Sequence, residues 1–328
     1  MPMFLIFLCI CFPQVNRQND NQVLAIKCVD LRNVDDQIRA GYLNEITMLQ
    51  RMQGSPLVVN LIDYELCEAR QMLFVVMEKG ACDLASFIKD VSRRRDMKLS
   101  TILAFWKDMV EAVAAIHERG IIHSDLKPAN FLVVGEVGFH QLKLIDFGIA
   151  SSVQSDMTSV VRESPAGTLN YMSPEAVQGM HGQQSRVKIN YKSDIWSLGC
   201  ILYNLLYGRT PFQQVTHPTL KADAICNPRH VIEFPARSPT LPGDGCVSSP
   251  LLQTVQACLT RDPSARPTAK QLLAIKYCGC NEMAMQSLEP LIYGLLSVIR
   301  SHPLGREFST RIIAALQEDV KHDRPGGH

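Results

Sequence analysis

The chain lacks an excess of charge of either sign and lacks a hydrophobic run long enough to cross a membrane. Its 33 basic and 32 acidic residues give a formal net charge of +1, so no broad field favours nucleic acid or an anionic membrane. The most apolar stretch, residues 1–12, is shorter than the ~20 residues of a spanning helix and lacks a basic n-region. We therefore expect neither a nucleic-acid partner nor a membrane partner.

The eleven cysteines form no framework of regular spacings. An odd and scattered set fits a reducing compartment better than a disulfide-bonded one. Cys9/Cys11 and Cys278/Cys280 each enclose one residue, but neither pair has a second Cys/His pair at the distance typical of a zinc finger. Cysteine usage therefore favours no structural zinc site.

Strand-like patterns dominate the first part of the chain, with one helical stretch among them. The strand-like runs, rich in Val, Ile and Leu, are 22–31, 57–64 and 72–78. From Asp35 to Met52 apolar residues recur every three to four positions, which predicts a helix. Lys27 stands out as a lysine in the middle of the first apolar run.

After Gly80 the pattern becomes mainly helical. Residues 100–120 have one apolar face, with Ser100 expected as the N-cap and Gly120 as the C-cap. Residues 194–208 are apolar on nearly all sides, which predicts a buried central helix. We predict an α+β chain of four segments: an atypical segment 1–21, a partial strand-rich lobe with a hinge 22–80, a helical lobe 81–280, and a helical extension and tail 281–328.

A set of polar residues in a fixed order carries the chemistry. The motif HSDLKPAN at 123–130 is followed, sixteen positions after its last residue, by DFG at 146–148. Phosphoryl transfer needs metal-binding oxygens, a proton acceptor for the attacking hydroxyl, and cations near the phosphates. Asp125 would orient or accept the hydroxyl proton, and Lys127 would stabilise the transferring phosphoryl group. Asn130 and Asp146 would hold Mg²⁺ ions.

These motifs make the chain resemble the eukaryotic protein kinases, from about Val23 to Arg266. The resemblance implies a two-lobed kinase fold with ATP and Mg²⁺ between an incomplete strand-rich lobe and a helical lobe. By resemblance, Lys27 contacts the α- and β-phosphates and Glu45 is its ion-pair partner. A lone glutamate on a helix is more often a solvated residue, but its order after Lys27 favours the functional interpretation.

The resemblance also assigns a hinge and three structural residues. Met77 stands at the gatekeeper position, and Glu78 and Gly80 stand in the hinge whose backbone binds adenine. The sequence Ser-Pro-Glu at 173–175 occupies the place where the family usually has Ala-Pro-Glu. Three further residues resemble structural positions of the family: Glu175 and Arg266 as the ion pair that anchors the activation segment, and Asp194 as the helix aspartate that braces the catalytic loop.

Within the kinases, the stretches IIHSDLKPANFLVV, LKLIDFGIA, GTLNYMSPEA and SDIWSLGCILY resemble the monopolar spindle (threonine-tyrosine, TTK) kinases of the spindle checkpoint. Ser124 replaces the arginine that in most kinases pairs with a phosphorylated activation loop. The resemblance implies proteins with Ser or Thr hydroxyls, and in this branch also Tyr, as substrates. It further implies self-association for autophosphorylation, with Thr158 as the best acceptor, and a location in cytoplasm and nucleus, at the kinetochore or spindle.

One part of the family pattern is missing. Kinases have a strand, a G-x-G-x-x-G turn and a second strand before the lysine strand, yet residues 1–22 contain no glycine. We therefore expect an unpaired edge along residues 23–29 and weak binding of ATP·Mg²⁺. The alternative to an active kinase is a catalytically weak or inactive scaffold. An anchored receptor-type kinase would depend on residues 1–12 alone.

Overall fold

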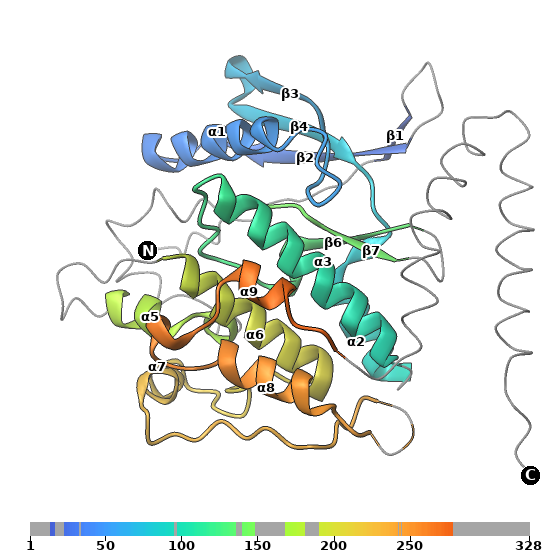
Figure 1. Ribbon diagram of the computed structural model, residues 1–328. Helices are drawn as coiled ribbons and strands as arrows, with labels where there is room; N and C mark the ends of the chain where they lie inside the picture. The colour runs from blue at the N-terminus through green and yellow to red at the C-terminus, as the bar shows by residue number, and fades with distance from the viewer. Residues whose placement is uncertain are drawn as a thin grey trace, which may run out of the picture. The chain divides into compact units, whose positions relative to one another are not determined.

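The computed structural model describes residues 14–16, 23–32, 34–94, 97–135, 140–147, 168–180, 190–241, 243 and 245–277. The chain divides into two compact units, Met1–Tyr277 and Cys278–His328, and every described residue belongs to the first. Within that unit, strands and one helix form one lobe, and helices dominate the other (Figure 1). The predicted α+β fold with a strand-rich and a helical lobe is confirmed.

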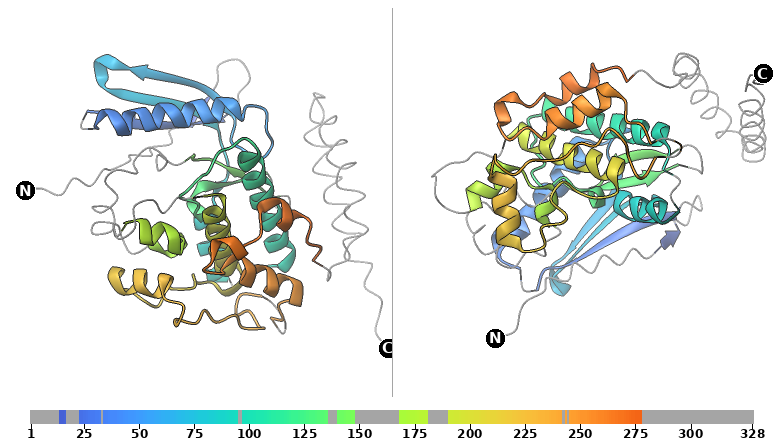
Figure 2. Two further views of the ribbon diagram at one scale, coloured as in Figure 1. Left: turned by 60° about the vertical axis from the view of Figure 1, so that its left-hand side comes forward. Right: turned by 90° about the horizontal axis from the view of Figure 1, so that it is seen from below.

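The strand-rich lobe is built on a four-stranded antiparallel sheet. Its order is β1-β2-β4-β3. The strands are β1 (Gln14–Asn16), β2 (Val23–Asp30), β3 (Leu61–Cys67) and β4 (Met72–Glu78). Helix α1 (Asp36–Arg51) lies along this sheet in the views of Figures 1 and 2. It begins where the side chain of Asp35 accepts a hydrogen bond from the backbone N–H of Ile38, as an N-cap does.

The prediction that the strand carrying Lys27, β2, has an unpaired edge is wrong for the first three residues of that strand. Strand β1 pairs with β2 in antiparallel register, from Gln14 opposite Ala25 to Asn16 opposite Val23. The polar segment that follows residue 12 therefore supplies a short strand. Sequence pattern missed it because three residues are too few to show an alternation of apolar and polar positions.

The helical lobe packs around one central helix. Helix α6 (Tyr191–Tyr207) is buried over most of its length and contacts α3 (Leu99–Glu118) and α8 (Ser249–Cys258) (Figures 1 and 2). The other α-helices described in this lobe are α2 (Leu84–Arg94), α5 (Pro174–Met180), α7 (Pro218–Cys226) and α9 (Ala269–Leu273). None of the described helices is both long and apolar enough to span a bilayer.

A small sheet connects the helical lobe to the site. It contains β5 (Cys82–Asp83), β6 (Phe131–Val134) and β7 (Gln141–Leu144) in that order, all antiparallel. The motif at 123–130 leads into β6, and the motif at 146–148 follows β7. Because β6 and β7 pair directly, the two motifs are brought to the same end of this sheet.

The two ends of helix α3 differ in how well their caps were predicted. Helix α3 starts at Leu99 with Lys98 as its N-cap and no side-chain capping bond, so the expectation of Ser100 as N-cap is wrong. Gly120 follows the C-cap residue Arg119 and has the positive φ of +75° that favours glycine. Buried Met97, just before the cap, shows that tertiary packing sets the start of α3.

The crossing of α6 and α8 requires a glycine. A Cβ atom on Gly199 would lie 2.7 Å from the Cβ of Cys258 and 3.1 Å from a Cδ of Leu259. Both neighbours are buried, so neither can move without repacking the core. The close approach of the two helices therefore depends on the missing side chain.

Replacing this glycine by alanine should destabilise the chain. Overpacking a core costs about 1–3 kcal/mol, so we expect Gly199→Ala to lower the free energy of unfolding by about 2 kcal/mol in urea denaturation. Gly243→Ala is the control, because Gly243 has φ +71° but nothing within 4 Å of its added Cβ, so only backbone strain applies. A smaller loss at Gly199 than at Gly243 would contradict the crossing argument.

Candidate active site

Lys27 on β2 lies between two carboxylates. Its Nζ is 2.9 Å from Oε1 of Glu45 on α1 and 2.8 Å from Oδ1 of Asp146, which follows β7. Lys27 and Glu45 are only 6% and 7% exposed. The structure thus brings together one residue from each of three of the segments in which the sequence predicted nucleotide-binding groups.

The three groups shift one another's pKa values. Burial alone would lower the pKa of Lys27, but the carboxylates of Asp146 and Glu45 raise it above its usual value. Burial is the largest influence on Glu45 and raises its pKa to about 7, although Lys27 opposes the shift. Burial also favours a higher pKa for Asp146, but Lys27 and hydrogen bonds outweigh it and lower that pKa. Of the two carboxylates, Glu45 therefore holds a proton more readily.

The catalytic loop places Asp125, Lys127 and Asn130 within a few residues of one another. Nζ of Lys127 is 2.5 Å from Oδ2 of Asp125, and both side chains are about one third exposed. Asn130 is buried and its Oδ1 accepts a hydrogen bond from the backbone N–H of Lys127, at 3.1 Å. The backbone N–H of Ile145 donates to the carbonyl of Asn130 at 2.9 Å, so Asn130 lies beside the segment that carries Asp146.

His123 links the two motifs. The backbone N–H of Asp125 points at Nδ1 of His123 at 3.4 Å, and Nε2 of His123 bonds to the backbone carbonyl of Asp146. Both contacts are satisfied by a neutral imidazole with its proton on Nε2, because Nδ1 then accepts and Nε2 donates. This residue therefore couples the backbone positions of Asp125 and Asp146.

Asp194 lies under the catalytic loop. Its fully buried carboxylate accepts hydrogen bonds from the backbone N–H groups of His123 (3.0 Å) and Ser124 (2.8 Å). Nε2 of His117, near the end of α3, is 2.8 Å from the same carboxylate. Ser124 has φ +72°, a conformation that non-glycine residues rarely adopt. The carboxylate thus holds the residue before Asp125 in a strained conformation.

The predicted hinge is joined to the strand before Asp146 by an ion pair. The carboxylate of Glu78 lies 2.6 Å from Nζ of Lys143 on β7 and accepts the backbone N–H of Asn60 at 2.8 Å. The backbone N–H of Glu78 donates to the carbonyl of Asn60. A contact of Glu78 with adenine would therefore use its carbonyl. Met77, the predicted gatekeeper, is buried just before it.

Gly80 is required at the hinge by a neighbour that the sequence did not reveal. A Cβ atom on Gly80 would lie 2.4 Å from Cγ of Leu132, on β6. Leu132 therefore lies directly beside the hinge backbone. Its position two residues after Asn130, in a short apolar strand, was the only available signal, and apolar strand residues are too common to single out.

The predicted ion pair between Glu175 and Arg266 is present, whereas two other residues of the predicted motifs lie outside the described part of the chain. Arg266 donates from Nη1 and Nη2 to the two carboxylate oxygens of Glu175, at 2.7 and 2.8 Å, and both side chains are buried. The predicted phosphorylation site Thr158 lies outside the described residues, as does Gly148.

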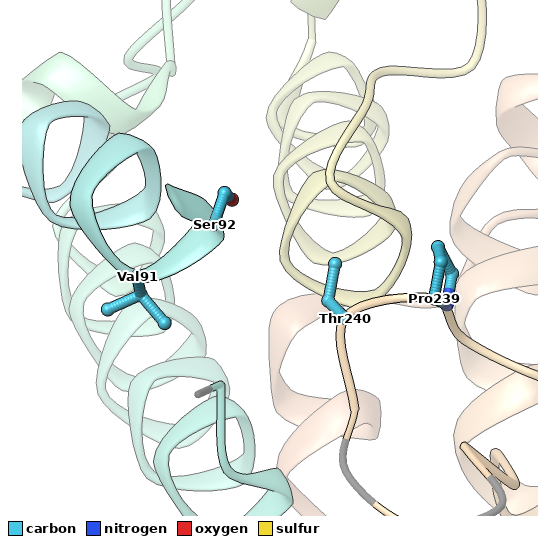
Figure 3. Close-up of a pocket in the computed structure, with 4 residues that line it drawn as sticks. All are labelled: Val91, Ser92, Pro239 and Thr240. Atoms are coloured by element: carbon cyan, nitrogen blue, oxygen red, sulfur yellow. The ribbon is translucent and has the colours of Figure 1, made fainter. Parts of the chain in front are cut away.

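A pocket of about 300 Å³ lies away from these residues. Figure 3 shows its lining residues, Val91 and Ser92 near the end of α2 and Pro239 and Thr240 in the segment before α8. Helix α2 starts close to the hinge, and seven residues of helix, about 10 Å, separate Leu84 from Val91. None of its four lining residues belongs to the site formed around Lys27.

Comparison with known proteins identifies relatives of the chain. Residues 11–278 match the family described as protein kinase domain, beyond both ends of the predicted resemblance. The dual specificity protein kinase TTK of Mus musculus is 43% identical over 261 residues, covering 78% of this chain and 28% of that protein. Dual specificity protein kinase Ttk of Danio rerio is 42% identical over 257 residues, with 78% and 24% covered. The probable serine/threonine-protein kinase mps1 of Dictyostelium discoideum is 42% identical over 257 residues, with 77% and 25% covered.

These similarities confirm the resemblance predicted from the motifs. The chain spans about a quarter of the length of these three relatives. The similarity therefore concerns the part of each relative that the chain covers.

The stability of the chain should decrease from about pH 5 to pH 8 because of Glu45. The pKa of Glu45 in the folded chain, about 7, exceeds the usual 4.5. The stabilising contribution of Glu45 to the free energy of unfolding is therefore fully present below pH 4.5 and is lost as the pH rises through 7. Asp146, with its lowered pKa, titrates below this range.

Urea denaturation at pH 5, 6, 7 and 8 tests this titration. Glu45→Gln cannot ionise and should flatten the decrease, whereas Glu65→Gln, at an exposed position of β3, should keep it. The same pH dependence in the wild type and in Glu45→Gln would show that Glu45 is ionised throughout this range.

Proposed function

Because the chain belongs to the protein kinase family, we propose that it transfers the γ-phosphoryl group of ATP to Ser and Thr hydroxyls of proteins. The observation that carries the proposal is the convergence of Lys27, Glu45 and Asp146 beside the loop that holds Asp125 and Asn130. The relatives are named as dual specificity or serine/threonine kinases, which supports the same reaction. By the same similarity we extend the acceptors to Tyr.

ATP and a divalent metal ion are general to protein kinase domains, and we propose Mg²⁺ as the ion. The oxygen atoms of Asn130 and Asp146 are the donors that Mg²⁺ prefers, namely amide and carboxylate oxygens. The backbone hydrogen bond from Ile145 to Asn130 keeps both residues on adjacent segments. These two residues therefore fit the ion, which when bound neutralises negative charge on the phosphates.

The side chains around the ion would divide the work of phosphoryl transfer. Lys27, held by Glu45, would bind the α- and β-phosphates. Asp125 would orient the acceptor hydroxyl and take its proton as the new oxygen–phosphorus bond forms and ADP leaves. Lys127, 2.5 Å from Asp125, would place a positive charge beside the transferring group. The hinge from Glu78 to Gly80 would position adenine through its backbone.

The spindle branch supplies the cellular part of the proposal. We propose protein substrates in the cytoplasm and nucleus, at the kinetochore or spindle, and self-association that allows autophosphorylation at Thr158. The similarity to the TTK and mps1 relatives supports this branch. The segment boundaries at 21, 80 and 280 stay predictions of the sequence.

Loss of either catalytic carboxylate should abolish phosphoryl transfer. We expect Asp125→Asn and Asp146→Ala each to reduce transfer of radiolabelled phosphate from ATP to casein by at least about 10²-fold. Asp125→Asn should keep its affinity for ATP·Mg²⁺ in calorimetry, because Asp125 serves the acceptor. The control is Asp63→Asn, at an exposed position of β3. Unchanged transfer by either catalytic variant would exclude the assigned roles.

Supplying a glycine-rich turn should raise the affinity for ATP. Since β1 already pairs with β2, the graft needs one strand and a G-x-G-x-x-G turn in place of residues 1–13. Two or three backbone hydrogen bonds to phosphate, at roughly 1.5–3 kcal/mol each, would strengthen binding by at least two orders of magnitude. Calorimetric titration with ATP·Mg²⁺ measures the gain. The matched control is the same graft with its three glycines replaced by valine, and equal affinity of all three proteins would mean that the turn is dispensable.

A further inference from the structure

The 3-10 turn η4 (Thr168–Tyr171) lies beside the catalytic loop because both are fixed to neighbouring positions of α6. The carboxylate of Asp194 binds the catalytic loop. The hydroxyl of Ser197 donates to the carbonyl of Tyr171 at 2.8 Å. Residues three positions apart are neighbours on one face of a helix. A polypeptide whose hydroxyl is bound at Asp125 would therefore lie within reach of η4.

Two helices hold η4. From α6, Nδ2 of Asn204 donates to the phenolic oxygen of Tyr171 at 3.1 Å, in addition to the bond from Ser197. From α7, Nζ of Lys221 donates to Oδ1 of Asn170 at 2.6 Å. The turn is thus fixed to the central helix at one residue and to a peripheral helix at the residue before it.

Lys221 is an unusual residue for the buried face of a helix. It is only 2% exposed, whereas Leu220 beside it is 62% exposed. Burying an ammonium group is unfavourable unless polar partners compensate it, and burial lowers the pKa of Lys221. An apolar residue could fill the same space at lower cost. The charged hydrogen bond to Asn170 is short and directional, which an apolar contact could not replace.

We propose that Lys221 is a positioning residue for the acceptor polypeptide, acting through Asn170 to fix η4 relative to Asp125. The proposal rests on the proposed function, since the acceptor is the protein that receives the phosphoryl group. It assigns to α7 a role in binding the acceptor. The nucleotide side is held by other contacts, those of Lys27 with Glu45 and Asp146. Loss of the hydrogen bond from Lys221 to Asn170 should therefore weaken binding of the acceptor polypeptide and leave binding of the nucleotide unaffected.

The first measurement needs no catalytic activity. In the full chain, hydrogen exchange of the backbone amides of residues 169–177 should be about tenfold faster in Lys221→Met and in Asn170→Leu, the effect of losing one charged hydrogen bond. The double variant should exchange no faster than Lys221→Met, because Lys221→Met already removes the bond to Asn170. Lys270→Met, at an exposed position of α9, should exchange like the wild type.

The second measurement separates the two substrates. With a casein-derived peptide containing Ser and Thr, KM for the peptide should rise about tenfold in Lys221→Met and in Asn170→Leu. KM for ATP and kcat at saturating peptide should stay within twofold of the wild type. A general loss of folding would instead change kcat and both KM values together, and Asn170→Leu, on the partly exposed turn, keeps the test valid if Lys221→Met fails to fold.

Three outcomes would overturn the proposal: unchanged exchange in both single variants, exchange rates that multiply in the double variant, or equal changes of KM for peptide and ATP. A wild-type chain that transfers no phosphate would instead reject the proposed function, and the acceptor role of Lys221 with it. The exchange rates would still show in that case whether Lys221 fixes η4.

Discussion

The buried carboxylate of Asp194 is the interaction on which the catalytic loop depends. It accepts two backbone N–H groups of that loop and contacts His117, with no exposure to solvent. Ser124 is thereby held at φ +72°, a conformation that costs about 1–3 kcal/mol for residues other than glycine. Without these bonds the loop would relax, and Asp125 would lose its fixed relation to His123 and Asp146.

The same helix fixes several other segments, so α6 acts as a common reference for the helical lobe. The hydroxyl of Ser193 donates to Glu175 at 2.8 Å, one residue before Asp194. Ser197 binds η4 through its hydroxyl, and the missing side chain of Gly199 allows α8 to pack close to α6. Because these contacts lie on successive turns of one rigid helix, the distances between the segments that they hold are set by helix geometry. This explains why a helix with almost no exposed surface carries so many polar contacts.

The residues of the site that the sequence predicted share one property: each belongs to a motif with a fixed order. Lys27 was found as a charged residue inside an apolar run, and Asp125 and Asp146 were found because phosphoryl transfer needs the carboxylates that their two motifs supply in a fixed order. Their roles stay predictions, while the structure shows that they converge.

The residues that were missed are Leu132, Lys143 and Lys221, whose partners lie far away in the sequence. Periodicity tells which face of an element is buried, but not which polar group it meets there. The prediction of Ser100 as the N-cap of α3 was wrong for a related reason, since packing of Met97 overrides a local capping preference.

The proposed acceptor side and the proposed nucleotide side of the site are held by different elements. The missing glycine-rich turn would therefore affect ATP binding and not the geometry around Asp125. The side proposed to bind the acceptor is held by contacts of η4 with α6, in the core, and with α7. The nucleotide side rests on β2, whose pairing with β1 covers only three residues. Backbone donors to phosphate are needed there, and residues 1–22 contain no glycine to let the chain approach closely. The groups proposed to bind the acceptor are therefore held independently of those proposed to bind the nucleotide, so weak ATP binding would not require a defect in the geometry around Asp125. An inactive chain with this structure would lack the affinity for ATP and retain the arrangement of its catalytic loop.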